Sequence, residues 1–340
     1  MKFDLSQEHR DLGAATRGAL SRLGHGADQS DDVVDAAVRS FGWADSSLDH
    51  LSVGVLAEEA GRALLQGTWW IMLSVGRVVT SVATATPALC LAAQPAIDYP
   101  GGDGRLHGTL HDVFGVANPG QVGDSGPQQL LFPSPTGVIG IDLSDPAVTI
   151  SPHPDGLDPS RPSSTVHLEG AKSGPPGASN AEWEQAQTRA NALLAAEATG
   201  VAQAMLDLAV DHAKARSQFG KPIGMFQAVA HPLADCFVDV ELARSSWWWA
   251  MATLDSPAVG SPMREQAVAT ASVLALRCLE TTSSASLQTL GAVGFTQEHI
   301  WHRYYRRAMW IRGYLAGRGP WQVLTAGLTK TDEAQGNTCE

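Results

Sequence analysis

A glycine- and proline-rich turn carries the side chains in this sequence that are best suited to hold a ligand. Residues 216–227 read Arg-Ser-Gln-Phe-Gly-Lys-Pro-Ile-Gly-Met-Phe-Gln. The guanidinium of Arg216 can hold a phosphate through two parallel hydrogen bonds, and Phe219 and Gln227 add a ring and an amide. The spacing also fits a simpler interpretation, in which Arg216 ends a helix and complements its dipole. The residues alone leave both interpretations open.

Long segments with helical periodicity must position this turn. Apolar residues recur at helical spacing on both sides of it, and Gly220, Pro222 and Gly224 interrupt the pattern between them. Helices are predicted at about 183–217, 226–254, 263–290 and 297–315. Similar lengths and short connections favour an antiparallel four-helix bundle, which we place at residues 181–320.

The preceding residues divide into a helical part and a strand-rich part. Residues 1–86 predict helices, one of which covers 51–65 with Glu58, Glu59 and Arg62 on its polar side. Residues 87–180 predict an antiparallel barrel or sandwich, because short strands alternate with turn residues. Its strands are expected at 113–117, 129–132, 138–141, 147–150 and 165–168. Residues 321–340 predict a flexible tail. The fold class is therefore mainly α with a central β domain.

Composition excludes some classes of function. The 340 residues carry a net charge of −12, which disfavours general nucleic-acid binding. Cys236 and Cys278 fall in apolar helical patterns and are expected to be small core residues, and the four cysteines show no paired spacing. We find no apolar run of the roughly 20 residues that span a bilayer, and no signal peptide. We therefore expect a soluble cytoplasmic protein without a membrane partner.

Other reactive side chains lack partners at informative spacing. His299 and His302 are three residues apart on a predicted helix, which suits a metal, but no third ligand lies near them in the sequence. Serine and cysteine nucleophiles lack a histidine at informative spacing. We therefore predict no metal site and no nucleophilic catalysis.

Two motifs in the helical region resemble those of the acyl-CoA dehydrogenase family. Residues 216–227 are similar to the family signature Arg-x-x-Phe-Gly-x-x-Ile followed by Phe-Gln, and residues 288–299 resemble its Gln-x-x-Gly-Gly-x-Gly-Phe run. Two further stretches are also similar to family sequences. They are Phe-Asp-Leu-Ser-Gln-Glu at 3–8, which resembles the start of family members, and Leu-Ala-Glu-Glu-Ala-Gly-Arg-Ala at 56–63. The resemblance implies N-terminal helices, a middle β-barrel and a C-terminal four-helix bundle.

The family's catalytic base has no match in this sequence. The family removes two hydrogens from the Cα–Cβ bond of an acyl-CoA, and a carboxylate takes the Cα proton while FAD accepts a hydride. By resemblance the base position is Leu315 here, and in other members it matches Ala190; neither side chain can accept a proton. Glu197, seven residues after Ala190, is a weak alternative because it lies on the same helix face.

The FAD motifs divide into two groups. The family's flavin-ring residues in the middle domain match residues 92–99 and 108–114 here, and both stretches lack the expected side chains. The helical motifs, which in the family reach across a subunit boundary to the neighbour's FAD pyrophosphate and adenosine, are retained. By match these cofactor-binding residues are Arg216, Gln218, Phe219, Phe226, Gln227, Gln288 and Gly291, with Ala292 in place of a second glycine.

This combination resembles the shorter subunit of heteromeric acyl-CoA dehydrogenases of actinobacterial steroid side-chain catabolism, which assemble as α2β2. It implies a non-catalytic subunit that shares FAD with a catalytic partner, takes acyl-CoA mainly through that partner, and has an electron-accepting flavoprotein as a further candidate partner. Consecutive tryptophans at 247–249 cannot all face one core, so at least one is expected at a subunit contact. The alternatives are an active homomer that uses Glu197 and a non-enzymatic scaffold with this fold.

Overall fold

The computed structural model describes residues 5–23, 34, 37, 38, 40–43, 47–75, 88–90, 96–98, 105–116, 129–153, 156–174, 177–317 and 319–325. By tertiary contacts the chain forms two compact units. The first comprises Met1–Asp28, Ser47–Leu65 and Asn191–Glu340, and the second comprises Gln29–Ser46 and Gln66–Ala190. The elements follow the predicted order of helices, strands and helices.

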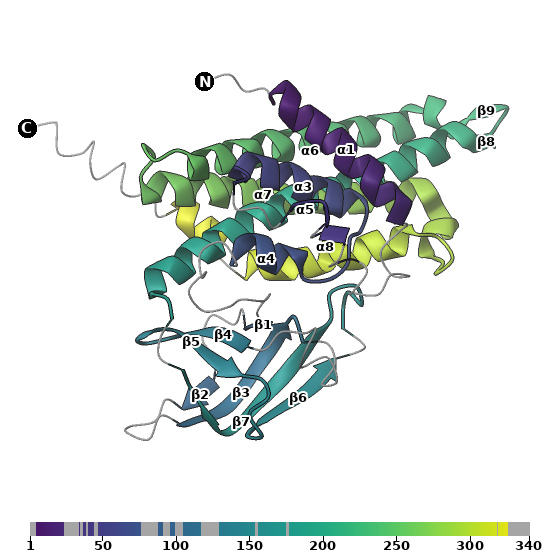
Figure 1. The fold of residues 1–340 in the computed structure, drawn as a ribbon. Helices are drawn as coiled ribbons and strands as arrows, with labels where there is room; N and C mark the ends of the chain where they lie inside the picture. Colours follow the sequence, from purple (N-terminus) through teal and green to yellow (C-terminus); the bar gives the residue numbers. More distant parts are fainter. Residues whose placement is uncertain are drawn as a thin grey trace, which may run out of the picture. The chain divides into compact units, whose positions relative to one another are not determined.

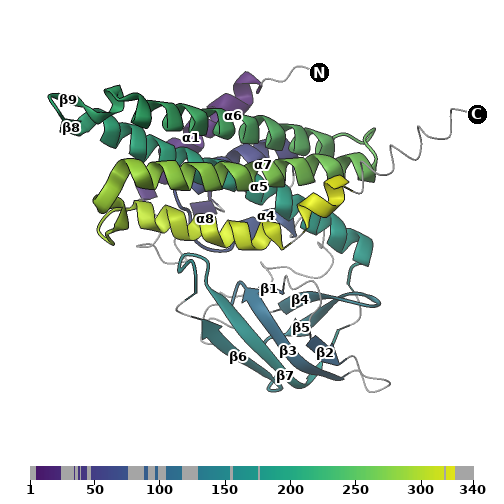
Figure 2. The same ribbon diagram turned by 180° about the vertical axis from the view of Figure 1, so that it is seen from behind.

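The first unit is helical. The predicted helices of the bundle are confirmed to within a few residues: α5 (Asn180–Ala215), α6 (Gln227–Asp255), α7 (Ser261–Leu290) and α8 (Trp301–Ala316) run side by side (Figures 1 and 2). Two helices from the start of the chain, α1 (Gln7–Leu23) and α3 (His50–Arg62), join this unit. A capping box starts α5, because the Ser179 amide donates to Glu182 Oε2 at 2.7 Å and the Glu182 amide donates to Ser179 Oγ at 3.2 Å.

Two glycines let α3 and α5 cross at backbone contact. A Cβ added at Gly200 would lie 1.9 Å from the carbonyl oxygen of Glu58, and one added at Gly61 would lie 2.1 Å from that of Glu197. The close crossing buries α3 continuously from Val53 to Gly61. The predicted polar face of this helix is therefore wrong for Glu58 and Glu59, which are buried in ion pairs rather than exposed to solvent.

The prediction that no apolar run is long enough to span a membrane also needs correction. By length and composition α5 is such a helix, since its best 18-residue window is mostly alanine, leucine and valine. Inside the protein, however, 78% of that window is buried, as expected for the central helix of a bundle. Burial among other helices accounts for its apolar composition.

The second unit contains a curled β-sheet. Its strands are β1 (Ala88–Cys90), β2 (Ala96–Asp98), β3 (Arg105–Phe114), β4 (Gln129–Ser134), β5 (Gly137–Asp142), β6 (Val148–His153) and β7 (Ser163–Lys172). Their order is β5-β4-β1-β3-β7-β6, with β2 paired to β3; β1 and β4 are parallel and the other pairs are antiparallel. Isolated bridges join Val138 to Ala178 and Ile141 to Ser173, so the sheet curls back on itself.

Alternating apolar residues fill the interior of this sheet. Leu110, Phe132, Ile141 and Val166 are fully buried in one hydrophobic cluster. Three of the predicted strands lie within observed ones, and the one predicted at 147–150 begins one residue before β6. The strand predicted at 113–117 overlaps only the end of β3, which runs from Arg105 to Phe114. Glycine, aspartate and histidine within β3 weaken its β pattern, and pairing with β7 supplies the stability that the local sequence lacks. The short helix α4 (Trp69–Ser74) also belongs to this unit.

Several smaller predictions can be compared with the structure. Cys236 and Cys278 are buried, as expected for core residues. The predicted tail begins with a helical stretch at 320–325, and residues 326–340 lie outside the described residues. Most of the stretch at 92–99, which matches the position of the family's flavin-ring motif, also lies outside the described residues. The other such stretch, 108–114, lies in β3, where Leu110 and Val113 point into the sheet's core.

Candidate cofactor-contact site

The turn between α5 and α6 folds as a tight hairpin that projects from one end of the bundle (Figures 1 and 2). Its strands are β8 (Ser217–Gln218) and β9 (Lys221–Pro222), and the 3-10 turn η3 (Ile223–Met225) leads into α6. The amide of Ile223 donates to the Arg216 carbonyl at 2.8 Å, which closes the loop. Gly224 packs tightly on α5, since a Cβ there would lie 3.2 Å from the Ala213 carbonyl oxygen.

Phe219 occupies the tip of the hairpin in a strained conformation. Its φ is +52° and that of Gly220 is +78°, as a two-residue hairpin turn with two left-handed residues requires. A bulky residue with positive φ is a steric outlier, and its ring is 92% exposed. The strain and the exposure both oppose folding stability, and such outliers cluster at functional sites.

A second aromatic ring supports the base of the hairpin. Phe226 lies edge-on to Phe219, with ring centroids 6.2 Å apart and planes at 86°. The ammonium of Lys221 lies 4.3 Å from the centre of the Phe226 ring, a favourable cation–π contact. Lys221 and two aromatic rings therefore form one patch beside Arg216.

Polar side chains around this patch are open to solvent. Arg216, Gln218 and Gln227 are exposed, and within the described part of the chain their side-chain nitrogen and oxygen atoms make no hydrogen bond or ion pair. Gln288, in the last turn of α7, is exposed in the same way. These groups are thus available to a ligand or to another subunit.

The second motif ends α7 at the same end of the bundle, where η4 (Gly291–Phe295) leads towards α8 (Figures 1 and 2). Gly291 takes φ +62° and ψ −138°, which requires glycine, whereas the exposed Ala292 lies inside the 3-10 turn. Burial is the main cause that lowers the pKa of His299, and the charges of His212 and His302 lower it further. His212, near the end of α5, is therefore close enough to His299 to affect its charge.

Two further exposed apolar side chains at this end were not among the predicted site residues. Phe295 is 76% exposed and Met225 is 65% exposed. Phe295 ends the run Gly-Ala-Val-Gly-Phe at 291–295, so its place in the motif was the signal that could have identified it. Large exposed apolar side chains gathered at one end of a helical unit are typical of a contact surface.

The base positions contain no ionisable group. Leu315 on α8 and Ala190 on α5 are each 1% exposed. The alternative base, Glu197, is fully buried, and its Oε1 lies 2.5 Å from Nη1 of the equally buried Arg307. A carboxylate held by an arginine must leave that partner before it can accept a substrate proton, so the geometry is that of a structural ion pair.

His299 and His302 are half-buried rather than at the surface. The backbone carbonyl of His299 lies 2.7 Å from Nδ1 of His302, and Nδ1 of His299 accepts from the Trp301 amide. Among the described residues, no group of three or more histidine, cysteine or acidic side chains is placed to hold a metal ion. His299 therefore caps the first amide of α8, and His302 is held against the His299 carbonyl.

Comparison with known proteins identifies the family to which the helices, the curled sheet and the two corner motifs belong. The family model "Acyl-CoA dehydrogenase, C-terminal domain" matches residues 178–325. FadE34, an acyl-CoA dehydrogenase of Mycobacterium tuberculosis, is 31% identical over 302 residues. The acyl-CoA dehydrogenase IpdE2 of the same organism is 40% identical over 116 residues. The chain belongs to the acyl-CoA dehydrogenase family.

These matches differ in extent. The FadE34 match covers 87% of this chain but 40% of that protein, and the IpdE2 match covers 34% of each. Among solved structures, a variant of the Tcur3481–Tcur3483 steroid ACAD has a TM-score of 0.78 at 21% identity, covering 96% of this chain and 99% of that one. The ChsE4–ChsE5 complex from M. tuberculosis has a TM-score of 0.78 at 19% identity, covering 98% and 99%. The structural likeness supports the fold.

Proposed function

We propose that this chain is the non-catalytic subunit of a heteromeric, FAD-dependent acyl-CoA dehydrogenase. The main support is a contrast within the first unit. Five of the seven residues that match the family's contacts to a neighbour's cofactor are exposed at one end of the bundle, and Phe226 and Gly291 are half-buried. The base position at Leu315, in contrast, is apolar and buried. A chain with this pattern can contribute residues to a partner's cofactor site, but it has no proton acceptor at position 315.

The open side chains fit the distal half of FAD. The guanidinium of Arg216 suits a pyrophosphate, the amides of Gln218, Gln227 and Gln288 suit ribose and base edges, and the exposed ring of Phe219 suits an adenine face. When bound, FAD supplies the hydride acceptor for α,β-dehydrogenation. The role of this chain is to hold and orient the cofactor, while the partner supplies the base and the flavin-ring pocket.

The similarity to FadE34 supports a divided site. Since the 302 matched residues make up 40% of that protein, the part outside the match is longer than this entire chain. Such a protein has room in one polypeptide for what we propose are two subunits here. Two of the structural neighbours carry the names of two proteins, and one of them is described as a steroid ACAD.

The substrate we propose is the CoA thioester of a bulky acyl chain such as a steroid side chain. A heteromer with one site per pair of subunits can devote more space to such a chain than a homomer in which every subunit binds substrate. Electrons would leave through an electron-transferring flavoprotein, and the complex would work in the cytoplasm as an α2β2 assembly.

The test is reconstitution with an acyl-CoA dehydrogenase of the same organism that carries an intact catalytic base. Replacing Arg216 by Ala should weaken FAD binding by the complex by roughly 10- to 100-fold, as expected for loss of a charged hydrogen bond. Lys214→Ala, an exposed cation on the same helix end outside the motif, is the matched control and should leave FAD affinity unchanged. Full FAD affinity in the Arg216→Ala complex would contradict the proposal.

A further inference from the structure

An uncharged seam of side chains runs along the outer side of α6. Its residues follow one another at intervals of four, three, four and three: Val238, Leu242, Ser245, Trp249 and Ala252. Because an α-helix completes a turn in about 3.6 residues, this spacing places all five on one face. It is also the repeat with which two helices pack their side chains into one another. The seam therefore has the pattern of a helix-docking surface.

This seam is open to solvent in the single chain. Val238 and Leu242 are 54% and 47% exposed, Ser245 is exposed, and Trp249 and Ala252 are half-buried. The outer face of a surface helix normally carries charged and polar side chains, whereas none of these five residues is charged. Large apolar side chains exposed along one helix are typical of an interface.

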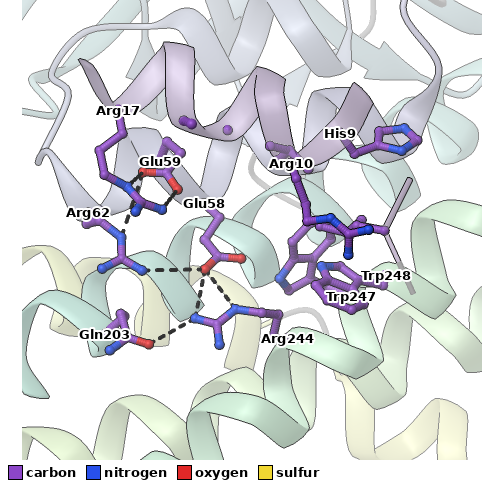
Figure 3. A pocket seen from close by; sticks show the side chains of 14 residues that line it. His9, Arg10, Arg17, Glu58, Glu59, Arg62, Gln203, Arg244, Trp247 and Trp248 are labelled. Atoms are coloured by element: carbon purple, nitrogen blue, oxygen red, sulfur yellow. Dashed lines mark hydrogen bonds and ion pairs between the residues drawn. The ribbon is translucent and has the colours of Figure 1, made fainter. Parts of the chain in front are cut away.

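The other sides of α6 are packed within the chain. Figure 3 shows Arg244 directed at Glu58 of α3, to which its Nε donates at 2.9 Å. On the side of α7, Asp239 forms an ion pair with Arg277 at 3.1 Å. Trp247 is fully buried. Successive residues of a helix are about 100° apart, so the seam residue two positions after Trp247 points to nearly the opposite side of α6. The seam thus faces away from α3 and α7.

The sizes of the seam residues suit a second copy of α6 that runs in the opposite direction. In a two-fold antiparallel contact centred on the middle of the seam, Leu242 lies opposite Ser245 of the other copy. Val238 lies opposite Trp249 in the next layer. Each layer then joins a larger side chain with a smaller one, which fills the space between the helices without overpacking it. Two-fold symmetry makes each of these layers twice.

Charge also favours the antiparallel direction. Asp235, three residues before Val238, is exposed at the end of the seam. In a parallel contact the two copies of Asp235 would meet and repel each other, and the two copies of Trp249 would occupy the same layer. In the antiparallel contact Asp235 lies opposite Ala252. Its two copies are then about 25 Å apart along the helices, well beyond the Debye length of about 8 Å.

We propose that two copies of this chain pack antiparallel along α6, with Val238, Leu242 and Trp249 at the centre of a two-fold interface. The contact uses none of the residues that we assign to FAD and needs no catalytic partner, so it is independent of the proposed subunit role. In the proposed α2β2 assembly the same contact would join the two heteromeric pairs.

Analytical ultracentrifugation of the full chain without a partner tests the contact. The natural chain should sediment as a dimer. Leu242→Glu should weaken self-association at least roughly 100-fold, because an unpaired charge is buried twice in each dimer. Leu157→Glu is the matched control, since Leu157 is 53% exposed and lies outside α6; this variant should remain dimeric. A monomeric natural chain, or normal dimerisation of Leu242→Glu, would overturn the proposal. So would a Leu242→Glu chain that loses the catalytic subunit and still dimerises.

Disulfide cross-linking tests the direction of the two helices. A Val238→Cys chain mixed with a Trp249→Cys chain should form a linked dimer on mild oxidation, because the two thiols share one layer. Neither variant alone should do so, since the two copies of residue 238 are about 16 Å apart along the helices. The natural chain gives the background, and its Cys236 and Cys278 are buried. Efficient cross-linking of Val238→Cys with itself would indicate a parallel contact and contradict the proposal.

Discussion

Glu197 of α5 and Arg307 of α8 form an ion pair of 2.5 Å in which both side chains are fully buried. Arg307 also donates to the carbonyl oxygen of Leu65 from Nη1 at 3.2 Å and from Nη2 at 3.3 Å. One guanidinium therefore links two helices and the segment that follows α3. The pair holds the only carboxylate that the sequence offered as an alternative base.

Breaking this pair should destabilise the fold strongly. Arg307→Met leaves an uncompensated buried carboxylate, and a loss of about 3–5 kcal/mol in the free energy of unfolding is expected. The double variant Glu197→Leu with Arg307→Met removes both charges and should recover most of that loss. Urea denaturation measures both. A loss below about 1 kcal/mol in the single variant would show that the pair is not desolvated as described.

The crossing of α3 and α5 should not tolerate a methyl group. In Gly200→Ala the new Cβ would lie 1.9 Å from the Glu58 carbonyl oxygen, so the helices must separate. Overpacking of this kind costs about 1–3 kcal/mol or more. Gly313→Ala is the control, because Gly313 is exposed within α8 and a Cβ there meets nothing within 4 Å. That change should stabilise the helix by about 0.5–1 kcal/mol. Thermal unfolding distinguishes the two, and similar melting temperatures would contradict the close crossing.

The sequence was sufficient to predict the helices of the bundle but not the buried ion pairs between them. Long amphipathic segments and the Gly-Pro corner near Arg216 are local signals, so α5 to α8 could be predicted with their ends. The burial of Glu58 and Glu59 could not, because it depends on arginines in α1 and α6 that are far away in sequence. The two motifs assigned seven corner residues to cofactor binding, which stays a prediction, whereas the exposure of Phe295 became clear only in the structure.

The three tryptophans of α6 show the same limit. Three consecutive tryptophans predicted that not all could face one core, and Trp247 is buried while Trp248 and Trp249 are half-buried. Their contact with a partner subunit stays a prediction.

Replacing Phe219 should leave folding stability intact and impair the proposed cofactor contact. Phe219→Gly removes the steric cost of φ +52°, so the chain should unfold at the same temperature or higher. The same change removes the exposed ring that we assign to the partner's cofactor, so the complex should lose FAD more readily. Thermal unfolding of the chain and FAD release from the complex are the two readouts. A less stable chain whose complex retains FAD normally would contradict both expectations.

Ionisation of Asp255 should make the free energy of unfolding depend on pH. Burial acts to raise its pKa, but the hydrogen bonds from His50 and from the amides of His50 and Leu51 outweigh burial and hold the pKa below its ordinary value. Its ionised form is therefore favoured by folding. This stabilisation is present above the unfolded pKa of about 3.9 and is lost as the pH falls through the folded pKa.

Asp255→Asn should therefore lower the free energy of unfolding at pH 7 by about 1 kcal/mol, as for loss of a helix-capping carboxylate. The difference from the natural chain should shrink as the pH falls below about 4. Urea unfolding across this range measures it. A difference that is constant with pH would mean that the charge of Asp255 does not stabilise the link between α6 and the start of α3.

The most direct test of the proposed subunit role is visible absorbance of the chain purified alone and after co-expression with an acyl-CoA dehydrogenase of the same organism that carries an intact base. The account predicts no flavin spectrum for the lone chain and about one FAD per pair of subunits in the complex. A lone chain that is yellow and is bleached by an acyl-CoA would contradict it, because such a chain would hold the flavin and supply the base itself.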